Sequence, residues 1–134
     1  METRRNFVAK IAAGMAATGF ISVANKANAS EAPIKDTFIH HVFFWLKEPE
    51  NTEARKQFEL GLQNLVKVPQ IQSYHIGIPV ESPREVVDDS FTYSYMVFFK
   101  SKEDQEIYQT HSIHLQFIED CQHLWKKVIV YDAM

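Results

Sequence analysis

Residues 108–125 decide how this chain folds, and they read YQTHSIHLQFIEDCQHLW. The phenol of Tyr108 and the imidazoles of His111 and His114 are crowded together where a helix begins. The amphipathic helix that follows must place its apolar stripe against a sheet, which brings these polar groups close to that contact. The fold and the chemistry are therefore expected to meet in this segment.

The helix predicted from Ser112 onward has an inward stripe at helical spacing. Its positions are His114, Ile118, Cys121 and Trp125. Because this stripe is apolar apart from the histidine, we expect His114 to point into the space between the helix and the sheet. A pocket in that space would be aromatic and mostly dry.

Four segments have the character of strands. Residues 37–47 are apolar at both odd and even positions, which is typical of a strand covered on both faces. Further strands are predicted over residues 71–78, 91–100 and 126–132. In the third strand, the side chains expected on one face are Phe91, Tyr93, Tyr95, Val97 and Phe99.

Two helical regions separate these strands. The first opens near Thr52 and ends before Pro69, and its apolar positions are Phe58, Gly61, Leu62 and Leu65. The second opens at Ser101, where Asp104 three residues later indicates a capping box, and it continues into the segment from Ser112. The order β-α-β-β-α-β predicts a ferredoxin-like α+β fold, with helices on one face of a four-stranded antiparallel sheet.

The strands are also apolar on the face that these helices leave uncovered. An uncovered apolar face on a four-stranded sheet is an association surface. Two copies that stack sheet on sheet about a two-fold axis would bury it. We therefore expect a homodimer.

Residues 1–29 are predicted to be a cleaved export signal. Arg4 and Arg5 precede an apolar stretch over residues 11–24, and residues 27–29 form a small-residue cleavage site. The apolar stretch is shorter than the roughly 20 residues that a spanning helix needs. We therefore expect a soluble domain with no membrane span in its mature form, located in the periplasm or outside the cell.

The route of export has two interpretations. Residues 3–8, which read TRRNFV, resemble a twin-arginine signal. In the alternative, the segment is an ordinary secretory signal and the paired arginines are incidental. Residues 30–36 are interpreted as a short linker, and residues 37–132 as the mature domain.

Removing the export signal makes the remaining chain acidic. The signal holds four of the fourteen basic residues and one of the seventeen acidic ones, which leaves ten and sixteen. This balance argues against nucleic acid as a partner. Cys121 is the only cysteine, so no intramolecular disulfide can form and stability must come from the core.

Three stretches together resemble the stress-responsive α/β barrel family, or Dabb family. They are the first strand with its histidine at residues 39–47, the motif YQTHSIH at residues 108–114, and the closing strand at residues 125–132. The likeness covers essentially all of residues 37–132. The family usually has Tyr-x-x-His-Pro-x-His in the second stretch, and Ser112 replaces the proline here.

The resemblance implies a ferredoxin-like dimer that forms an α+β barrel. It implies no single activity, because the family contains stress proteins, proteins of unknown role and a plant polyketide cyclase. In that cyclase a tyrosine and the last histidine of the motif are acid–base partners, and they match Tyr108 and His114. The first-strand histidine of the family matches His40, and His41 is an additional histidine.

The chemistry open to Tyr108 and His114 also follows from their side chains alone. Histidine takes and returns a proton near neutrality, and a tyrosine hydroxyl stabilises the oxyanion of an enolate. The pair suits proton abstraction beside a carbonyl, as in cyclisation, isomerisation or decarboxylation of a small aromatic or polyketide-like acid. The candidate catalytic residues are His114 and Tyr108, and the candidate binding residues are His40, His111, Phe117 and Trp125.

Each of these residues has a structural interpretation as well. His111 can cap the helix, and His114 can hydrogen-bond Tyr108 or a backbone carbonyl, as buried polar groups usually do. Phe117 and Trp125 can simply fill the core. In that case the protein is a non-catalytic dimer with a binding or stress-response role.

The histidines also raise the question of a metal. His111, His114 and one of His40 or His41 have suitable chemistry for zinc, copper or iron. No acidic or thiolate ligand completes the set in the sequence, so we predict no metal, and we predict no cofactor. A haem is the alternative, because related dimeric barrels bind it. Cys121 is expected to be a small buried core residue.

Overall fold

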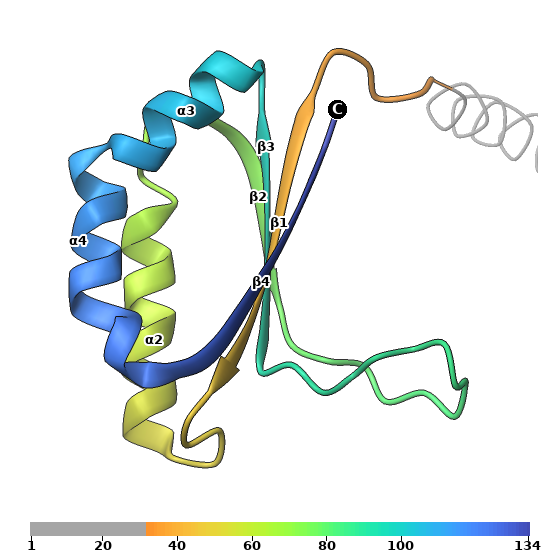
Figure 1. Ribbon diagram of the computed structural model, residues 1–134, viewed down its shortest axis with the longest axis vertical. Helices are drawn as coiled ribbons and strands as arrows, with labels where there is room; N and C mark the ends of the chain where they lie inside the picture. Colours follow the sequence, from red (N-terminus) through yellow and green to blue (C-terminus); the bar gives the residue numbers. More distant parts are fainter. Residues whose placement is uncertain (1–31) are drawn as a thin grey trace, which may run out of the picture. The chain divides into compact units, whose positions relative to one another are not determined.

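The computed structural model describes residues 32–134 (Figure 1). Its helices and strands are, in chain order, β1 (Phe38–Leu46), α2 (Thr52–Leu65), β2 (Ile71–Gly77), β3 (Tyr93–Phe99), α3 (Lys102–Thr110), α4 (Ser112–Cys121), the short 3-10 helix η1 (Gln122–Leu124) and β4 (Trp125–Ala133). The predicted β-α-β-β-α-β order is confirmed, with the second helical region divided into α3 and α4. The export signal predicted for residues 1–29 lies outside the described residues.

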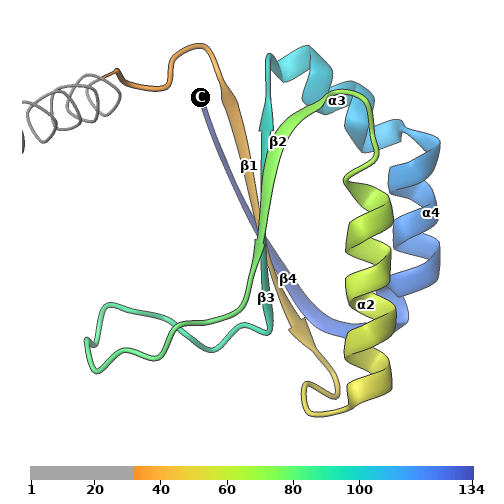
Figure 2. The same ribbon diagram turned by 180° about the vertical axis from the view of Figure 1, so that it is seen from behind.

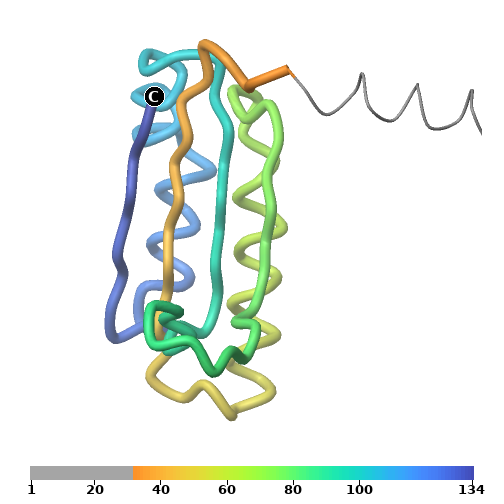
Figure 3. The backbone as a smooth tube through the Cα atoms, turned by 90° about the vertical axis from the view of Figure 1, so that its right-hand side faces the viewer, coloured from red at the N-terminus to blue at the C-terminus, as the bar shows by residue number. Residues whose placement is uncertain are grey.

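The four strands form one sheet in the order β2-β3-β1-β4, and every neighbouring pair is antiparallel. Figure 1 and Figure 2 show α2, α3 and α4 together on one side of this sheet. Figure 3 looks at the other side, where the strands lie in front of the helices. This is the predicted ferredoxin-like arrangement.

Alternation along β1 and β3 builds the core under the helices. The buried side chains are Phe38, Val42, Phe44 and Leu46 in β1, and Tyr93, Tyr95, Val97 and Phe99 in β3. The helix α2 faces them with Phe58, Leu62 and Leu65, at the predicted positions. Gly61 lies on the same stripe, and a Cβ there would collide with the Sγ of Cys121 on α4. The glycine therefore lets the two helices pack closely.

Side chains that accept from free backbone N–H groups fix where the helices begin. The Oδ1 of Asn51 accepts from the N–H groups of Glu53 and Ala54 at 3.0 and 3.1 Å. The Oγ of Ser101 accepts from the N–H of Asp104 at 3.1 Å, which is the first bond of the predicted capping box.

The prediction that Trp125 lies on the helical stripe is wrong. The helix α4 ends at Cys121, and Gln122–Leu124 form the tighter 3-10 turn, so Trp125 is the first residue of β4. Its ring still reaches the same region, because it stacks on Phe117 with 5.7 Å between the ring centroids.

Phe91 does not share the face predicted for it. The backbone N–H of Thr92 donates to the Phe44 carbonyl at 2.7 Å, and the Oγ1 of Thr92 accepts from the Leu46 N–H at 3.0 Å. These bonds turn the buried Thr92 toward β1 and interrupt the alternation before β3 begins. The ring of Phe91 instead packs on Phe43, with 5.0 Å between centroids.

No helix of the described residues covers the other side of the sheet (Figure 2). The register places there the side chains of Ile39, His41, Phe43, Trp45, Met96, Phe98, Ile129 and Tyr131. We call this surface the open face. The connection between β2 and β3 projects from the same side (Figure 1). Within residues 32–134, every helix is too short or too polar to cross a membrane.

Candidate functional site

A cavity of about 300 Å³ lies between the sheet and helices α3 and α4. Its apolar wall consists of Val42, Phe44, Leu65, Phe117, Ile118, Trp125, Val128 and Val130. Val128 and Val130 belong to the edge strand β4 and are 36% and 45% exposed, so the cavity meets solvent along this strand. Its volume is at the lower end of the range for small-molecule sites, about 300–1,000 Å³.

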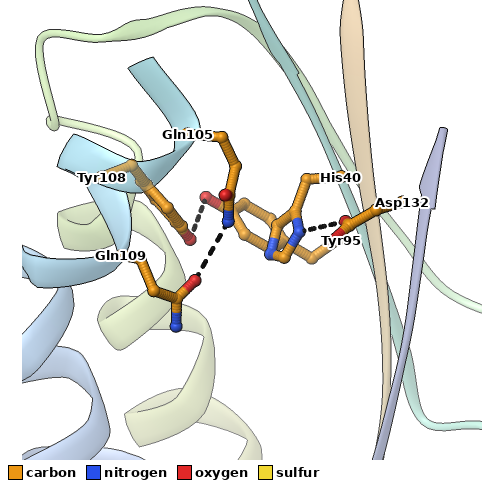
Figure 4. A network of polar contacts seen from close by, with 6 residues as sticks. All are labelled: His40, Tyr95, Gln105, Tyr108, Gln109 and Asp132. Carbon is orange, nitrogen blue, oxygen red and sulfur yellow. Dashed lines mark hydrogen bonds and ion pairs between the residues drawn. The ribbon is translucent and has the colours of Figure 1, made fainter. Parts of the chain in front are cut away.

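Seven polar side chains also line this cavity, namely His40, Tyr95, Gln105, Tyr108, Gln109, His114 and Asp132. Figure 4 shows six of them facing one another from the sheet and from α3. Gln105, Tyr108 and Gln109 have the spacing of one helical face. Gln105 donates from Nε2 to the Oε1 of Gln109 at 3.1 Å.

The imidazole of His40 is paired with the carboxylate of Asp132. The antiparallel register of β1 and β4 places these residues directly opposite each other, so their side chains share a face. The Nδ1 of His40 lies 2.6 Å from the Oδ1 of Asp132. A carboxylate that accepts from Nδ1–H fixes the tautomer and leaves the ring's lone pair on Nε2.

Two buried phenols lie beside this pair. The hydroxyls of Tyr108 and Tyr95 are hydrogen-bonded at 3.3 Å, and both residues are about 1% exposed. Burial raises the pKa of both hydroxyls. They therefore stay protonated near neutrality and can act as hydrogen-bond donors.

His114 completes the polar side of the cavity. The centroid of its ring lies 4.8 Å from the ring centroid of Tyr108. The Tyr108 ring centroid lies 5.8 Å from that of His40. Burial lowers the pKa of His114, and the charge of His40 lowers this pKa further. A hydrogen bond with the backbone of Gln109 acts in the opposite direction and raises it. Its Nδ1 is buried and makes no hydrogen bond within residues 32–134. The imidazole is thus neutral at neutral pH and can accept a proton.

Five of the six predicted site residues line the cavity, and His111 does not. His111 ends α3 and begins α4, and its Nδ1 accepts from the Ile113 N–H at 3.1 Å. The structure therefore gives His111 the capping interaction that the sequence offered as its structural role. His41 points to the open face, where its Nε2 lies 2.7 Å from the Oγ of Ser94.

Sequence reasoning missed four polar residues of the cavity, namely Tyr95, Gln105, Gln109 and Asp132. Two of them carried a usable signal, because Gln105 and Gln109 lie three residues before and one after Tyr108 on the same predicted helix. Tyr95 and Asp132 become neighbours of the site only through strand pairing. Their proximity depends on the register, which local pattern does not reveal.

Within residues 32–134, no group of three or more histidine, cysteine or acidic side chains is placed to hold a metal. The imidazoles considered as ligands are dispersed, since His111 caps α4 and His41 lies on the open face. Burial raises the pKa of the Cys121 thiol to about 11, and the charge of Asp120 adds to this effect. Cys121 is buried, as expected for a core residue.

Several solved structures share this fold. A hydroxynitrile lyase from Passiflora edulis is 21% identical with a TM-score of 0.64, over 75% of this chain and 94% of that protein. A Dabb family protein with a ferredoxin-like fold from Mesorhizobium loti is 19% identical with a TM-score of 0.62, over 73% and 95%. A dimeric protein of unknown function from Bacteroides fragilis, also ferredoxin-like, is 16% identical with a TM-score of 0.59, over 75% and 98%.

No curated protein matches the chain. Residues 38–134, which contain every strand and helix described above, match the family model of the stress responsive A/B barrel domain. The resemblance recognised in the sequence is confirmed by this match. The chain therefore belongs to the stress responsive A/B barrel domain family, or Dabb family.

Proposed function

We propose that this protein binds a small aromatic carbonyl compound in the cavity and catalyses proton transfer beside the carbonyl, as a cofactor-independent lyase or cyclase. The observation that carries this proposal is the convergence of two imidazoles and two protonated phenols on one mostly apolar cavity. Such a combination of an apolar wall and a few polar groups is typical of small-molecule sites.

His114 is assigned the role of general base. Its lowered pKa keeps the imidazole neutral, and its buried Nδ1 has no hydrogen-bond partner within residues 32–134. His114 takes a proton from the carbon beside the carbonyl, and the C–H electron pair forms the double bond of an enolate. The same imidazole then returns the proton to carbon or to a leaving group.

Tyr108 is assigned the role of oxyanion donor. Its hydroxyl stays protonated, so it can donate to the oxygen on which the enolate's negative charge develops. Tyr95 lies within hydrogen-bonding distance of this hydroxyl at 3.3 Å. In the structure the Tyr108 O–H donates to Tyr95, so this bond has to reverse when a ligand binds. Tyr95 would then donate to the Tyr108 oxygen and strengthen the donation of Tyr108 to the ligand.

His40 is assigned to ligand binding. The carboxylate of Asp132 at 2.6 Å holds the ring in one orientation, with Nε2 free to accept from a ligand hydroxyl. The hydroxynitrile lyase among the structural neighbours supports lyase chemistry on this fold. That support is an analogy of fold and adds nothing about individual residues.

The alternative is a non-catalytic binding or stress-response protein. It is favoured by the fact that the hydroxyl of Tyr108 and the Nδ1 of His40 already have partners in Tyr95 and Asp132. In that interpretation the polar groups satisfy one another and hold the start of α4. The cavity would then bind a ligand without transforming it.

We also propose that two copies associate through the open face. This surface carries apolar side chains from β1, β3 and β4, and a stable monomer rarely leaves such a surface exposed. Structural neighbours that are dimers support this proposal.

We further propose that residues 1–29 direct export and are then removed. Mass spectrometry of the protein isolated from its producing cell tests this proposal. The measured mass is expected to be that of a chain without residues 1–29.

Exchange of α-protons for deuterium tests the catalytic proposal without knowledge of the natural substrate. Acetophenone is incubated with the protein in D₂O, and loss of its methyl signal is followed by proton NMR. The wild type is expected to accelerate exchange. Removing the base with His114→Gln should cost about 10²–10⁴-fold, whereas the exposed His123→Gln on η1 serves as the matched control.

Two results would redirect the assignment. Binding of acetophenone without accelerated exchange would favour the non-catalytic alternative. Accelerated exchange that survives His114→Gln would show that another group is the base.

A further inference from the structure

The charges around the cavity carry information about its ligand. Among the fifteen residues of the described chain that line it, none is a lysine or an arginine, and Asp132 is the only acidic one. Carboxylate ligands are usually held by a guanidinium or an ammonium group. This cavity offers neither.

The histidines do not replace the missing cation. His40 is paired with Asp132, so the two together carry no net charge when the imidazole is protonated and one negative charge when it is neutral. Burial keeps His114 in its neutral form near pH 7. The polar side of the cavity is therefore neutral or negative at neutral pH.

The two helix ends beside the cavity carry opposite partial charges, and neither supplies a full cation. Tyr108 and Gln109 lie in the last turn of α3 (Lys102–Thr110), and the C-terminal end of a helix carries a partial negative charge. The N-terminus of α4 is capped by the Nδ1 of His111, which accepts from Ile113. His114 in the first turn of α4 (Ser112–Cys121) lines the cavity, so the partial positive charge of this helix end is set against the partial negative charge of the end of α3.

The uncharged polar groups suit a neutral ligand instead. The Gln105 amide donates to the Oε1 of Gln109 at 3.1 Å (Figure 4), which leaves the carbonyl oxygen of Gln105 and the amide nitrogen of Gln109 for other partners. Tyr108 adds a hydroxyl donor. These groups can bind a carbonyl or hydroxyl oxygen without compensating a charge.

We infer that the cavity selects uncharged aromatic carbonyl compounds over their carboxylate counterparts, and this inference rests on the binding role proposed above. An apolar cavity of 150 Å³ binds benzene, and this one has about 300 Å³. The ligand class is thus a single aromatic ring with a short neutral carbonyl substituent, such as an aldehyde, ketone, ester or amide. Burying a carboxylate here would leave its charge unpaired beside Asp132.

Calorimetric titration with isosteric ligands tests this inference. Benzamide and benzoate have nearly the same shape and differ by one charge at pH 7.5, and acetophenone serves as a second neutral ligand. The neutral compounds are expected to bind at least about 30-fold more tightly than benzoate, from the unpaired-charge penalty.

A substitution at the cavity mouth provides the matched test. Val128 lines the cavity, faces the helices opposite Phe44 and is 36% exposed, so a lysine there can extend its stem along the wall and keep its ammonium near solvent. Relative to Val128→Gln, Val128→Lys is expected to raise the ratio of benzoate affinity to benzamide affinity at least about tenfold.

The outcomes separate the inference from the function on which it rests. Benzoate binding as tightly as benzamide to the wild type would overturn the selection for neutral ligands and leave the binding role intact. An unchanged benzoate-to-benzamide ratio in folded Val128→Lys would show that charge is not the determinant and would also overturn it. Binding of none of the three compounds would reject the binding role itself, and the inference with it.

Discussion

Replacing Tyr95 and Tyr108 by phenylalanine, singly and together, separates the structural from the catalytic role of the Tyr108 hydroxyl. Each single substitution removes the 3.3 Å hydrogen bond and leaves one hydroxyl in a site where both residues are about 1% exposed. Losing the partner of a buried hydroxyl costs about 1–3 kcal/mol. Because both residues line the cavity, water can replace part of the lost partner, and we expect about 1 kcal/mol for each.

The double variant leaves no hydroxyl without a partner. Its free energy of unfolding should therefore fall by less than the sum of the two single losses, with a coupling energy of about 1 kcal/mol. Urea unfolding of the four proteins measures this cycle. A coupling energy near zero would mean that the two hydroxyls do not interact in solution.

The deuterium-exchange rate of acetophenone distinguishes the two phenols. Tyr108→Phe removes the assigned oxyanion donor and should slow exchange at least about 100-fold. Tyr95→Phe leaves that donor in place, so a loss of about 1 kcal/mol in polarisation corresponds to about fivefold. Equal losses in the two single variants would refute the assignment of Tyr108 as the donor.

Three further variants test other parts of the structure. Burial lowers the pKa of His114, so as the pH falls the unfolded chain takes up this proton before the folded protein does. Stability should therefore fall as the pH drops below about 6.5. The urea midpoint of His114→Gln should vary less between pH 7 and 5 than that of the wild type. His41 lies on the open face, where association would bury it further and favour its neutral form. Sedimentation should therefore detect dimer dissociation as the pH drops from 7 to 5, and a dimer of His41→Gln that is equally sensitive would contradict this. Gly61→Ala should cost about 1–3 kcal/mol by collision with the Cys121 Sγ, and adding Cys121→Ala should recover part of that loss in thermal unfolding.

Local patterns were sufficient for the fold. Apolar residues at odd and even positions of residues 37–47 indicated a strand with two apolar faces, of which the helices bury one and the other lies on the open face. The spacing of Phe58, Leu62 and Leu65 indicated the stripe of α2. These features depend on neighbours within a few residues. Where a non-local bond intervened, the local pattern failed, as at Thr92, whose bonds to β1 turn Phe91 to the open face.

The site was predicted only in part, for the same reason. Tyr108 and His114 lie close together in sequence and on neighbouring helices, so their proximity could be inferred. His40 and Asp132 are 92 residues apart, and only the register of β1 with β4 brings them together. The position of Trp125 depended on how the chain leaves α4, where a 3-10 turn replaces a further turn of α-helix.

The proposed ligand site is the cavity between the sheet and helices α3 and α4, with His114 and Tyr108 against the ligand. A nuclear Overhauser experiment on the protein with bound acetophenone tests whether the ligand lies there. Contacts are expected from the ligand protons to the rings of Tyr108, His114, Phe117 and Trp125, which line the cavity. Contacts confined to residues of the open face, such as Phe43 or Tyr131, would contradict this assignment.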